Sequence, residues 1–388
     1  MKKLNYLLPV IVFTCILFGL CVKGITSADK TYSSAEKREL QTRPKMSAEA
    51  IRKGTFQEKY ETYLSDQFPG RDMWVQLQTD ASRLMGKSVS NGVYFGKDDY
   101  LLEHHTDAEF ETKQERKNIK SLVELVKNIA DDYSVHVMLV PTKTWTLQQK
   151  LPFCASTYDE QKMYDSLNEQ LGNLADSVVV PVQETLCSHR EEDIYYRTDH
   201  HWTPLGAFYA YTEFCNAKGI RANNILQYKK KTFKGFKGTF YRDTNNNKTL
   251  RADNIQTFYP LSGKKISMYY KTVQGQKIHA PLIDNVSRYG ESLKYCAFIS
   301  GDNPLTVIKN KAIKDGSSCV VVKESFGNVF VPYLADHYQN VYVIDYRYWS
   351  GKLSSFVQKK KVQDVILLNN ISMTRNSYLV SKLGGIAG

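Results

Sequence analysis

From residue 108 onward, the sequence alternates between segments with the apolar spacing of helices and short, almost wholly apolar runs. The helical spacings cover residues 108–131, 158–174, 204–218, 326–337 and 353–361. The apolar runs cover residues 135–140, 178–182, 295–300, 318–323, 341–345 and 364–369. Such runs are typical of strands buried on both faces, and parallel strands need long connections between them, usually helices. The alternation therefore predicts an α/β fold in which a parallel sheet is flanked by helices.

Two stretches depart from this alternation. Residues 91–103 carry aromatic and apolar side chains on both sides of the turn Gly96-Lys97-Asp98-Asp99, which is typical of a β-hairpin. Residues 219–291 are rich in Lys, Asn, Gly and Tyr, which predicts a small β-rich insertion over one edge of the sheet. We therefore expect one catalytic domain over residues 54–388, interrupted by an insertion at about residues 219–291.

The N-terminus combines a basic flank with an apolar run. Met1-Lys2-Lys3 precedes the run from Leu4 to Val22, which is close to the length that crosses a bilayer. A cleaved signal peptide, with a cleavage site near Ser27-Ala28, is the alternative to a retained anchor. We favour an anchor over residues 1–28, followed by a polar tether over residues 29–53, because the run is longer than a usual signal core. The domain is then expected on the extracytoplasmic face of the membrane, or secreted if the segment is cleaved.

Charge and cysteine content narrow the choice of partner and cofactor. A formal net charge of +12, with a pI near 9.1, indicates a solvated basic surface or attraction to a polyanion such as anionic lipid or a cell-wall polymer. No nucleic-acid recognition pattern accompanies this charge, so we expect no nucleic-acid partner. Five of the seven cysteines lie outside the apolar run, at long spacings and without a CxxC pair. This spacing predicts no zinc site and leaves disulfide pairing open.

The densest group of chemically active side chains is the segment Arg197-Thr198-Asp199-His200-His201-Trp202-Thr203-Pro204. A carboxylate two residues before a histidine can accept a hydrogen bond from the imidazole, which fixes its tautomer and raises the basicity of the outer nitrogen. Ser325 is the candidate nucleophile, because it follows the strand-like run Val320-Val321-Val322 and precedes a helix start. Asp199, His201 and Ser325 are therefore the candidate catalytic triad. An N-capping serine and a buried structural histidine are the alternatives.

Further residues are candidates for an oxyanion or substrate site. Asn369 ends one strand-like run and Asn303 follows another, and at such a position a side-chain amide could reach an oxyanion or simply end a strand; Lys143 occupies a similar position. Arg347 could steady a carbonyl or an acidic sugar, or form a surface salt bridge. Of the two residues beside His201, Trp202 could pack the turn or support a sugar ring, and His200 could line the pocket or face solvent.

A metal site at Asp199 and His201 is the remaining interpretation of this segment. The sequence has no HExxH pattern, and the other histidines form no array with ligand spacing. We therefore rank a general base first, a structural role second and a metal ligand third for His201, and expect neither a metal nor a tightly bound cofactor.

The same segment resembles the DHHW-motif proteins of Gram-positive bacteria and, more distantly, the alginate O-acetyltransferases, which are SGNH-hydrolase-like proteins. In that group an aspartate, one further residue, a histidine and a tryptophan precede the nucleophilic serine, a circular permutation of the usual motif order. Asp199, His201, Trp202 and the pair Ser325-Phe326 fall on those positions, and the turn over residues 92–97 also recurs. The resemblance covers most of the chain after the tether and implies an SGNH-hydrolase-like α/β fold.

The resemblance also implies an activity. It implies an extracytoplasmic O-acetyltransferase that acetylates a cell-surface or secreted polysaccharide through an acetyl ester of Ser325, with His201 as the base and Asp199 orienting it. A membrane-bound acyltransferase partner would supply the acetyl group. Two alternatives stay open: a carbohydrate acetyl esterase that uses the same triad with water, and a non-catalytic polysaccharide-binding or assembly protein.

Overall fold

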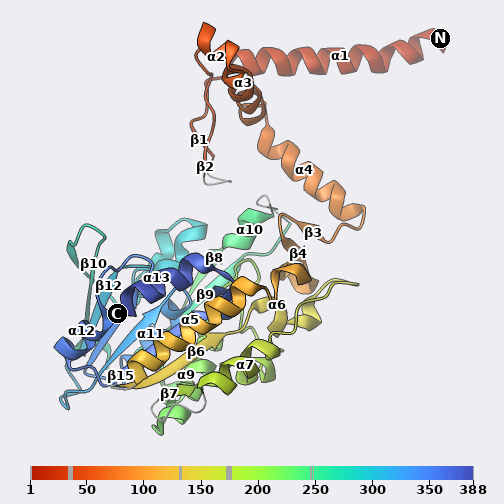
Figure 1. Cartoon of the computed structure of the whole chain (residues 1–388). Coiled ribbons are helices and arrows are strands. Elements are labelled where there is room, and N and C mark those ends of the chain that lie inside the picture. The colour runs from red at the N-terminus through yellow and green to blue at the C-terminus, as the bar shows by residue number, and fades with distance from the viewer. Residues whose placement is uncertain are drawn as a thin grey trace. The chain divides into compact units, whose positions relative to one another are not determined.

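The structure is a computed structural model that describes residues 2–33, 38–130, 133–171, 177–244, 247 and 249–387. Its internal contacts divide the chain into two compact units. One unit comprises residues 1–91 with 241–249, and the other comprises residues 92–240 with 250–388. Figure 1 labels the helices and strands of both units.

The first unit contains a long N-terminal helix followed by short elements. Its elements are α1 (Lys2–Thr26), β1 (Tyr32–Ser33), β2 (Arg38–Glu39), α2 (Ala48–Arg52), α3 (Thr55–Asp66), α4 (Arg71–Leu84) and β3 (Val89–Ser90). Within α1, Leu7–Thr26 is long and apolar enough to cross a membrane, a property that signal sequences share. The predicted N-terminal apolar helix is confirmed, and the choice between an anchor and a signal peptide stays a prediction.

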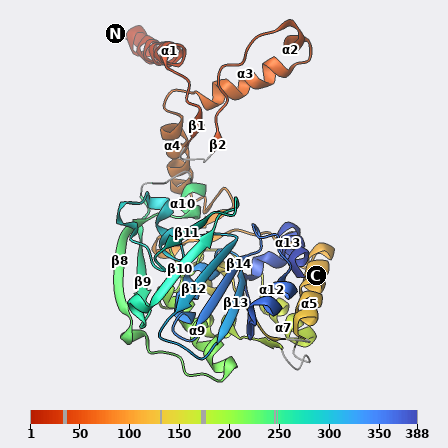
Figure 2. The same cartoon turned by 90° about the vertical axis from the view of Figure 1, so that its left-hand side faces the viewer.

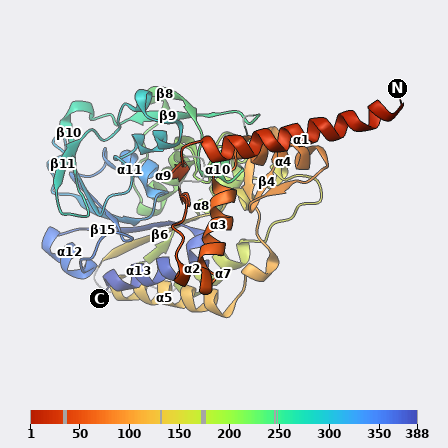
Figure 3. The same cartoon turned by 90° about the horizontal axis from the view of Figure 1, so that it is seen from above.

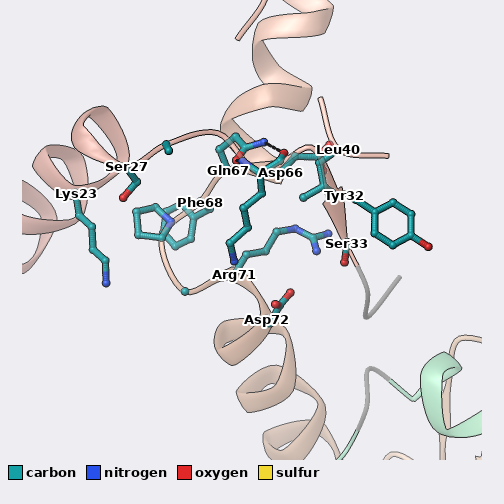
Figure 4. Close-up of a pocket in the computed structure, with 14 residues that line it drawn as sticks. Lys23, Ser27, Tyr32, Ser33, Leu40, Asp66, Gln67, Phe68, Arg71 and Asp72 are labelled. Atoms are coloured by element: carbon teal, nitrogen blue, oxygen red, sulfur yellow. Dashed lines mark hydrogen bonds between the residues drawn. The ribbon is translucent and has the colours of Figure 1, made fainter. Parts of the chain in front are cut away.

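Side-chain pairing joins α3 to the segment that follows α1. The Arg38 guanidinium donates two hydrogen bonds to the Asp66 carboxylate, at 2.6 and 3.0 Å, and the Gln67 side chain exchanges two hydrogen bonds with the backbone of Lys30. A hollow of about 430 Å³ lies beside Asp66 and Gln67, and Figure 4 shows these two side chains among the residues that line it. Residues 54–91, expected in the catalytic domain, therefore group with the N-terminal helix by their contacts, while the domain limits as a whole stay a prediction.

The second unit is built on a large sheet, which has eight strands in the described residues. Strands β14, β13, β15, β6 and β7 run parallel in that order, and β12, β10 and β11 extend the β14 edge as antiparallel strands. Figure 2 shows β10, β12, β14 and β13 side by side. The bounds are β6 (Ser134–Val140), β7 (Ser177–Val179), β10 (Ile266–Lys271), β11 (Lys277–Ala280), β12 (Leu305–Asn310), β13 (Ser318–Lys323), β14 (Asn340–Asp345) and β15 (Asp364–Asn370). The predicted α/β fold with a largely parallel sheet is confirmed.

Side chains of the strands enter two hydrophobic cores, one on each face of the sheet. In β13, Val320 and Val322 belong to one core and Cys319 and Val321 to the other, because successive strand side chains point to opposite faces. Helices α5, α7, α12 and α13 cover the first core, and α8, α9 and α11 cover the second; Figure 3 shows α5 and α13 on one side of the sheet and α9 and α11 on the other. The bounds are α5 (Lys113–Ala130), α7 (Gln161–Leu171), α8 (Val182–Ser188), α9 (Pro204–Lys218), α11 (Gly327–Leu334), α12 (Leu353–Lys360) and α13 (Ser377–Ala387). Burial on both faces explains why the strands are continuous apolar runs in the sequence.

The insertion contributes strands in two places. Strands β8 (Lys229–Phe236) and β9 (Asp253–Tyr259) pair as an antiparallel ribbon, with α10 (Thr239–Asp243) between them in the chain. Strands β10 and β11 join the antiparallel edge of the large sheet. Outside the insertion, the predicted hairpin is confirmed as β4 (Val93–Phe95) and β5 (Leu101–Glu103), and the short helix α6 (Lys143–Thr146) follows β6.

The predicted strand over residues 295–300 is wrong. The chain there forms a 3-10 helix over Glu291–Ala297, and the next strand of the sheet is β12. Tyr295 and Phe298 are buried as expected, but Tyr295 packs against other aromatic rings, including Phe236 of the insertion. A short apolar run predicts burial and does not by itself distinguish a strand from another buried segment.

Candidate active site

Ser325 lies on a sharp turn between a strand and a helix. Strand β13 ends at Lys323 and α11 begins at Gly327, so Ser325 lies at the carboxyl end of β13. In the sheet, β13 lies between β14 and β15. A Cβ at position 327 would overlap the side chain of Lys323, so glycine allows the helix to begin this close to the strand. Ligands of open parallel sheets bind at the carboxyl ends of strands, which is where the structure places Ser325.

The Asp-His loop, residues 196–203, is held at the start of α9. The backbone N–H of Tyr196 donates to the carbonyl oxygen of His201 at 3.2 Å and closes the loop. Thr203 caps α9, because its hydroxyl accepts the N–H of Gly206 at 3.3 Å, and Pro204 occupies the first helical turn. The helix start therefore fixes the position of the residues just before it.

Two buried ionisable side chains from other segments, Lys143 and Asp253, bind the backbone of the Asp-His loop through hydrogen bonds. The ammonium of Lys143 donates to three carbonyl oxygens of the loop, at 2.8, 2.9 and 3.1 Å. The carboxylate of Asp253, in β9, accepts the backbone N–H groups of Arg197 and Thr198, both at 2.8 Å. Burial lowers the pKa of Lys143 to about 7 and raises the pKa of Asp253. The loop conformation therefore depends on a helix after β6 and on the insertion.

The structure brings the three triad candidates into one hydrogen-bonded chain. Nδ1 of His201 lies 2.5 Å from Oδ1 of Asp199, and Nε2 lies 2.7 Å from Oγ of Ser325. Because a carboxylate only accepts hydrogen bonds, Nδ1 carries a proton, and in a neutral ring with this tautomer Nε2 is the atom that can accept the proton of the serine hydroxyl. This bonding pattern assigns the tautomer that base-assisted attack by a serine requires.

Asp199 is buried and ionised. Burial raises the pKa of Asp199. The imidazoles of His200 and His201 and the backbone N–H of Thr239 lower it by more than burial raises it, so the pKa lies well below its ordinary value. Thr239 belongs to the insertion and donates to Oδ2 of Asp199 at 2.8 Å. A Cβ at Gly238 would overlap the Asp199 carboxylate, so the insertion can approach this closely only with glycine at position 238.

Aromatic rings hold the imidazole of His201. Tyr295 stacks on it with the ring centroids 4.1 Å apart, and its hydroxyl donates to the carbonyl oxygen of Ser325 at 3.1 Å. Phe326 packs against another side of the imidazole, with the centroids 4.9 Å apart. Trp202 is fully buried and its indole N–H donates to the carbonyl oxygen of Phe326 at 2.9 Å. Trp202 therefore anchors the loop, and the alternative of a sugar platform is wrong because the indole has no exposed face.

Glu324 places a second carboxyl group beside Ser325. Its Oε2 lies 3.0 Å from Oγ of Ser325, and its Oε1 accepts the backbone N–H of Asn370 at 3.1 Å. Glu324 is 8% exposed. Burial raises its pKa, against the opposing charge of Arg347. The serine hydroxyl therefore lies between an imidazole and a buried carboxyl group.

A cavity of about 100 Å³ lies next to the turn that carries Ser325, but Ser325 and His201 are not among the residues that line it. Its wall includes both sequence neighbours of the serine and the half-buried ring of His200. The full lining is Glu103, Thr142, Lys143, His200, Glu324, Phe326, Asn370, Ser372, Met373 and Leu379. Burial and the neighbouring His201 lower the pKa of His200, so a neutral imidazole faces the cavity.

Asn303, Asn369 and Arg347, the other candidates from the sequence, do not line this cavity either. Asn303 donates its amide to a backbone carbonyl at 3.2 Å, and Asn369 is buried with its amide oxygen accepting from the hydroxyl of Tyr346 at 2.7 Å. The guanidinium of Arg347 pairs with Asp345 at 2.6 Å and with a second aspartate at 2.8 Å. The structure therefore brings Asp199, His201, Ser325 and His200 together, and it places Asn303, Asn369 and Arg347 in structural contacts elsewhere.

The residues that sequence reasoning missed include Thr239, Asp253, Tyr295 and Glu324, which contact the triad candidates or the Asp-His loop. Thr239 and Asp253 lie 40 and 55 positions from the loop residues that they contact, and no local pattern identifies them. Glu324 carried the only direct signal, because it precedes the candidate nucleophile in the sequence.

Asp199, His200 and His201 also form a group of side chains that could bind a metal ion. Asp199, His200 and His201 each offer a ligand atom, and these atoms lie within 4.8 Å of one another. Both ring nitrogens of His201 are already engaged, Nδ1 by Asp199 and Nε2 by Ser325. A metal would have to displace one of these hydrogen bonds, so the arrangement fits an acid–base histidine better than a metal ligand.

Comparison with protein families identifies related sequences. A family model described as DHHW protein matches residues 119–344. The chain is 25% identical over 163 residues to the probable alginate O-acetylase AlgJ of Pseudomonas syringae pv. tomato, and this match covers 40% of this chain and 40% of that protein. The chain therefore spans less than half of the length of this relative.

Solved structures share the fold. A DHHW family protein from Eubacterium siraeum is similar with a TM-score of 0.65 and 24% identity, over 76% of this chain and 95% of that chain. PatB1 of Bacillus cereus is similar with a TM-score of 0.59 and 22% identity, over 73% of this chain and 97% of that chain. These similarities show that this chain shares the α/β fold of those proteins, and at this identity they say nothing further about activity.

Proposed function

This chain belongs to the DHHW protein family, and on that premise we propose that it is an O-acetyltransferase that acts on a cell-surface or secreted polysaccharide outside the membrane. The observation that carries the proposal is the chain of hydrogen bonds from Asp199 through His201 to Ser325. An oriented base, an accessible hydroxyl and an adjoining small cavity are the parts that acyl transfer through a serine ester requires.

In the first step, Oγ of Ser325 attacks the carbonyl carbon of an acetyl donor. The hydroxyl proton moves to Nε2 of His201, and Asp199 stabilises the imidazolium that forms. The backbone N–H of Ser325 donates to the oxyanion of the tetrahedral intermediate. The bond to the donor then breaks, the leaving group takes the proton from Nε2, and the acetyl group remains as an ester of Ser325.

In the second step, a sugar hydroxyl replaces the donor. His201 takes its proton while the sugar oxygen attacks the acetyl carbon, and the bond between that carbon and Oγ of Ser325 breaks. The proton returns from Nε2 to Oγ, which restores the resting triad. Water can take the place of the sugar, in which case the protein is an acetyl esterase that uses the same residues.

The acceptor and the setting are inferred from several observations. The name of the relative, probable alginate O-acetylase, supports a polysaccharide acceptor. The apolar helix Leu7–Thr26 supports a position at the membrane, and the basic flank Lys2-Lys3 before it supports placing the bulk of the chain outside. A membrane-bound acyltransferase partner that supplies acetyl groups to the outer face is part of the same proposal, because acetyl donors are made inside the cell.

The test uses the purified chain with an aryl acetate donor, with and without oligosaccharide acceptors that are neutral, amino-substituted or uronic. We expect mass spectrometry to find an acetyl group on the peptide that contains Ser325, and acceptors to gain acetyl groups. Ser325→Ala should abolish both signals, whereas Ser267→Ala, an exposed serine on β10, should keep them. Release of free acetate alone would favour the esterase, and equal behaviour of Ser325→Ala and the parent would favour a non-catalytic binding protein.

A further inference from the structure

Ser325 has one hydroxyl proton but two close oxygen or nitrogen partners. Its Oγ lies 2.7 Å from Nε2 of His201 and 3.0 Å from Oε2 of Glu324. Both distances are those of hydrogen bonds, and each bond needs a proton between its two atoms. The serine supplies only one, so the second proton must come from one of the two partners.

The bonds of the neighbouring groups allow two distributions of these protons. Nδ1 of His201 donates to the ionised Asp199, so in the neutral ring Nε2 is an acceptor and takes the serine proton. The contact between Ser325 and Glu324 then requires a proton on Glu324. The alternative distribution, an imidazolium at His201 and a carboxylate at Glu324, would direct the serine proton toward Glu324 and away from the base.

We propose that Glu324 is a carboxylic acid in the resting protein, and that its O–H donates to Oγ of Ser325 and reserves the serine proton for His201. A carboxylate at this position would compete with the imidazole for that proton. The proton on Glu324 would therefore set the direction in which the serine hydroxyl donates.

The surroundings of Glu324 favour the neutral form. The side chain is buried, and its second oxygen accepts one backbone N–H, from Asn370 of β15. The charged and titratable groups that face it from other elements are Arg347, His200, Glu103, Tyr346 and Tyr295. Arg347 favours ionisation, but its guanidinium is shared with two aspartates, and the Glu103 carboxylate lines the same cavity. Burial raises the pKa of Glu324 in this setting.

The catalytic consequence rests on the proposed function. When the bond between the acetyl carbon and Oγ of Ser325 breaks, negative charge develops on Oγ. A carboxylic acid 3.0 Å away can donate to that oxygen and stabilise it, whereas a carboxylate would repel it. Activity should therefore fall as the pH rises through the pKa of Glu324, because the donor is lost.

The proton on Glu324 can be measured without any substrate. Infrared spectra of the full chain at pH 6 should contain the carbonyl band of a buried protonated carboxyl group, and Glu324→Gln should remove part of it. Glu160→Gln is the matched control, because Glu160 is a second buried glutamate, hydrogen-bonded to Thr142, whose pKa burial raises to about 7. If Glu324→Gln leaves the band unchanged while Glu160→Gln reduces it, Glu324 is ionised and the proposal is overturned.

The pH profile of acetyl-ester hydrolysis then tests the consequence. Glutamine keeps an N–H donor at every pH, so Glu324→Gln should stay active and lose the alkaline decline that the parent shows. Glu324→Ala should be at least about 10-fold slower than the parent at pH values below the pKa of Glu324, and Glu160→Gln should keep the alkaline decline. An alkaline decline that persists in Glu324→Gln would overturn the inference. A parent without any serine-dependent activity would instead contradict the proposed function, and the infrared result would still stand.

Discussion

The indole N–H of Trp202 donates a hydrogen bond to the backbone carbonyl of Phe326 at 2.9 Å, so the residue after His201 is bonded to the residue after Ser325. These two residues lie 124 positions apart in the chain. The bond fixes the Asp-His loop against the turn after β13. It therefore contributes to the 2.7 Å separation of Nε2 and Oγ, on which the proposed chemistry depends.

Replacing Trp202 by Phe should separate this hydrogen bond from the aromatic packing. We expect Trp202→Phe to lose about 1–3 kcal/mol of unfolding free energy, because a buried carbonyl is left without its donor. The rate of acetyl transfer should fall by about 10-fold or more, because the Asp-His loop is no longer held in a fixed position against the turn after β13. Denaturant unfolding and initial rates measure the two effects. Trp349→Phe, a partly buried tryptophan of the other core, should lower stability without a comparable loss of rate.

Asp199→Asn should test the orienting carboxylate. The amide favours the opposite tautomer of His201, with the proton on Nε2, so we expect the transfer rate to fall by about 10³-fold or more while the fold persists. The pKa of Asp199 is lowered in the folded protein, so its contribution to stability is present above the ordinary aspartate pKa and is lost as the pH falls below it. Unfolding curves at decreasing pH should therefore show the parent losing its stability relative to Asp199→Asn; parallel curves would contradict the assignment.

Lys143→Met should change how the free energy of unfolding depends on pH, because Lys143 is buried. The pKa of Lys143 is about 7 in the folded protein against an ordinary value of 10.5, so the unfolded chain binds more protons between these pH values. The unfolding free energy of the parent should therefore rise with pH in this window relative to the variant, by at most about 1.4 kcal/mol per pH unit. The variant should also transfer acetyl more slowly, because three carbonyl oxygens of the Asp-His loop lose their donor. Lys294→Met, a buried lysine that contacts a different loop, is the control.

Chelators should not change the rate. Both ring nitrogens of His201 are engaged in hydrogen bonds, so the proposed reaction needs no ion at Asp199, His200 or His201. We expect the same acetyl-ester hydrolysis before and after treatment with EDTA and with a zinc-selective chelator. A loss of activity that added zinc restores would establish the metal hydrolase in place of the serine mechanism.

Much of the fold could be predicted from local patterns. The apolar run of β13, the helix of α9 and the hairpin of β4 and β5 all lie where the periodicity places them. Prediction failed at residues 295–300, because Tyr295 is buried by contacts with distant rings rather than by neighbouring strands. The sequence predicted that residue 295 is buried, but it did not predict that distant aromatic rings bury it rather than neighbouring strands.

By itself, the sequence determined the alternation of strands and helices, the capped start of α9 at Thr203-Pro204 and the approach of Asp199 to His201. These features depend on residues a few positions apart, whose geometry the local backbone sets. Only the tertiary structure decided that Ser325 meets Nε2 of His201, that Asp253 and Thr239 reach the Asp-His loop from the insertion, and that Glu324 faces the serine hydroxyl from a buried position. Those contacts depend on how the sheet, the helices and the insertion pack together, and packing between distant segments leaves no periodic trace in the chain.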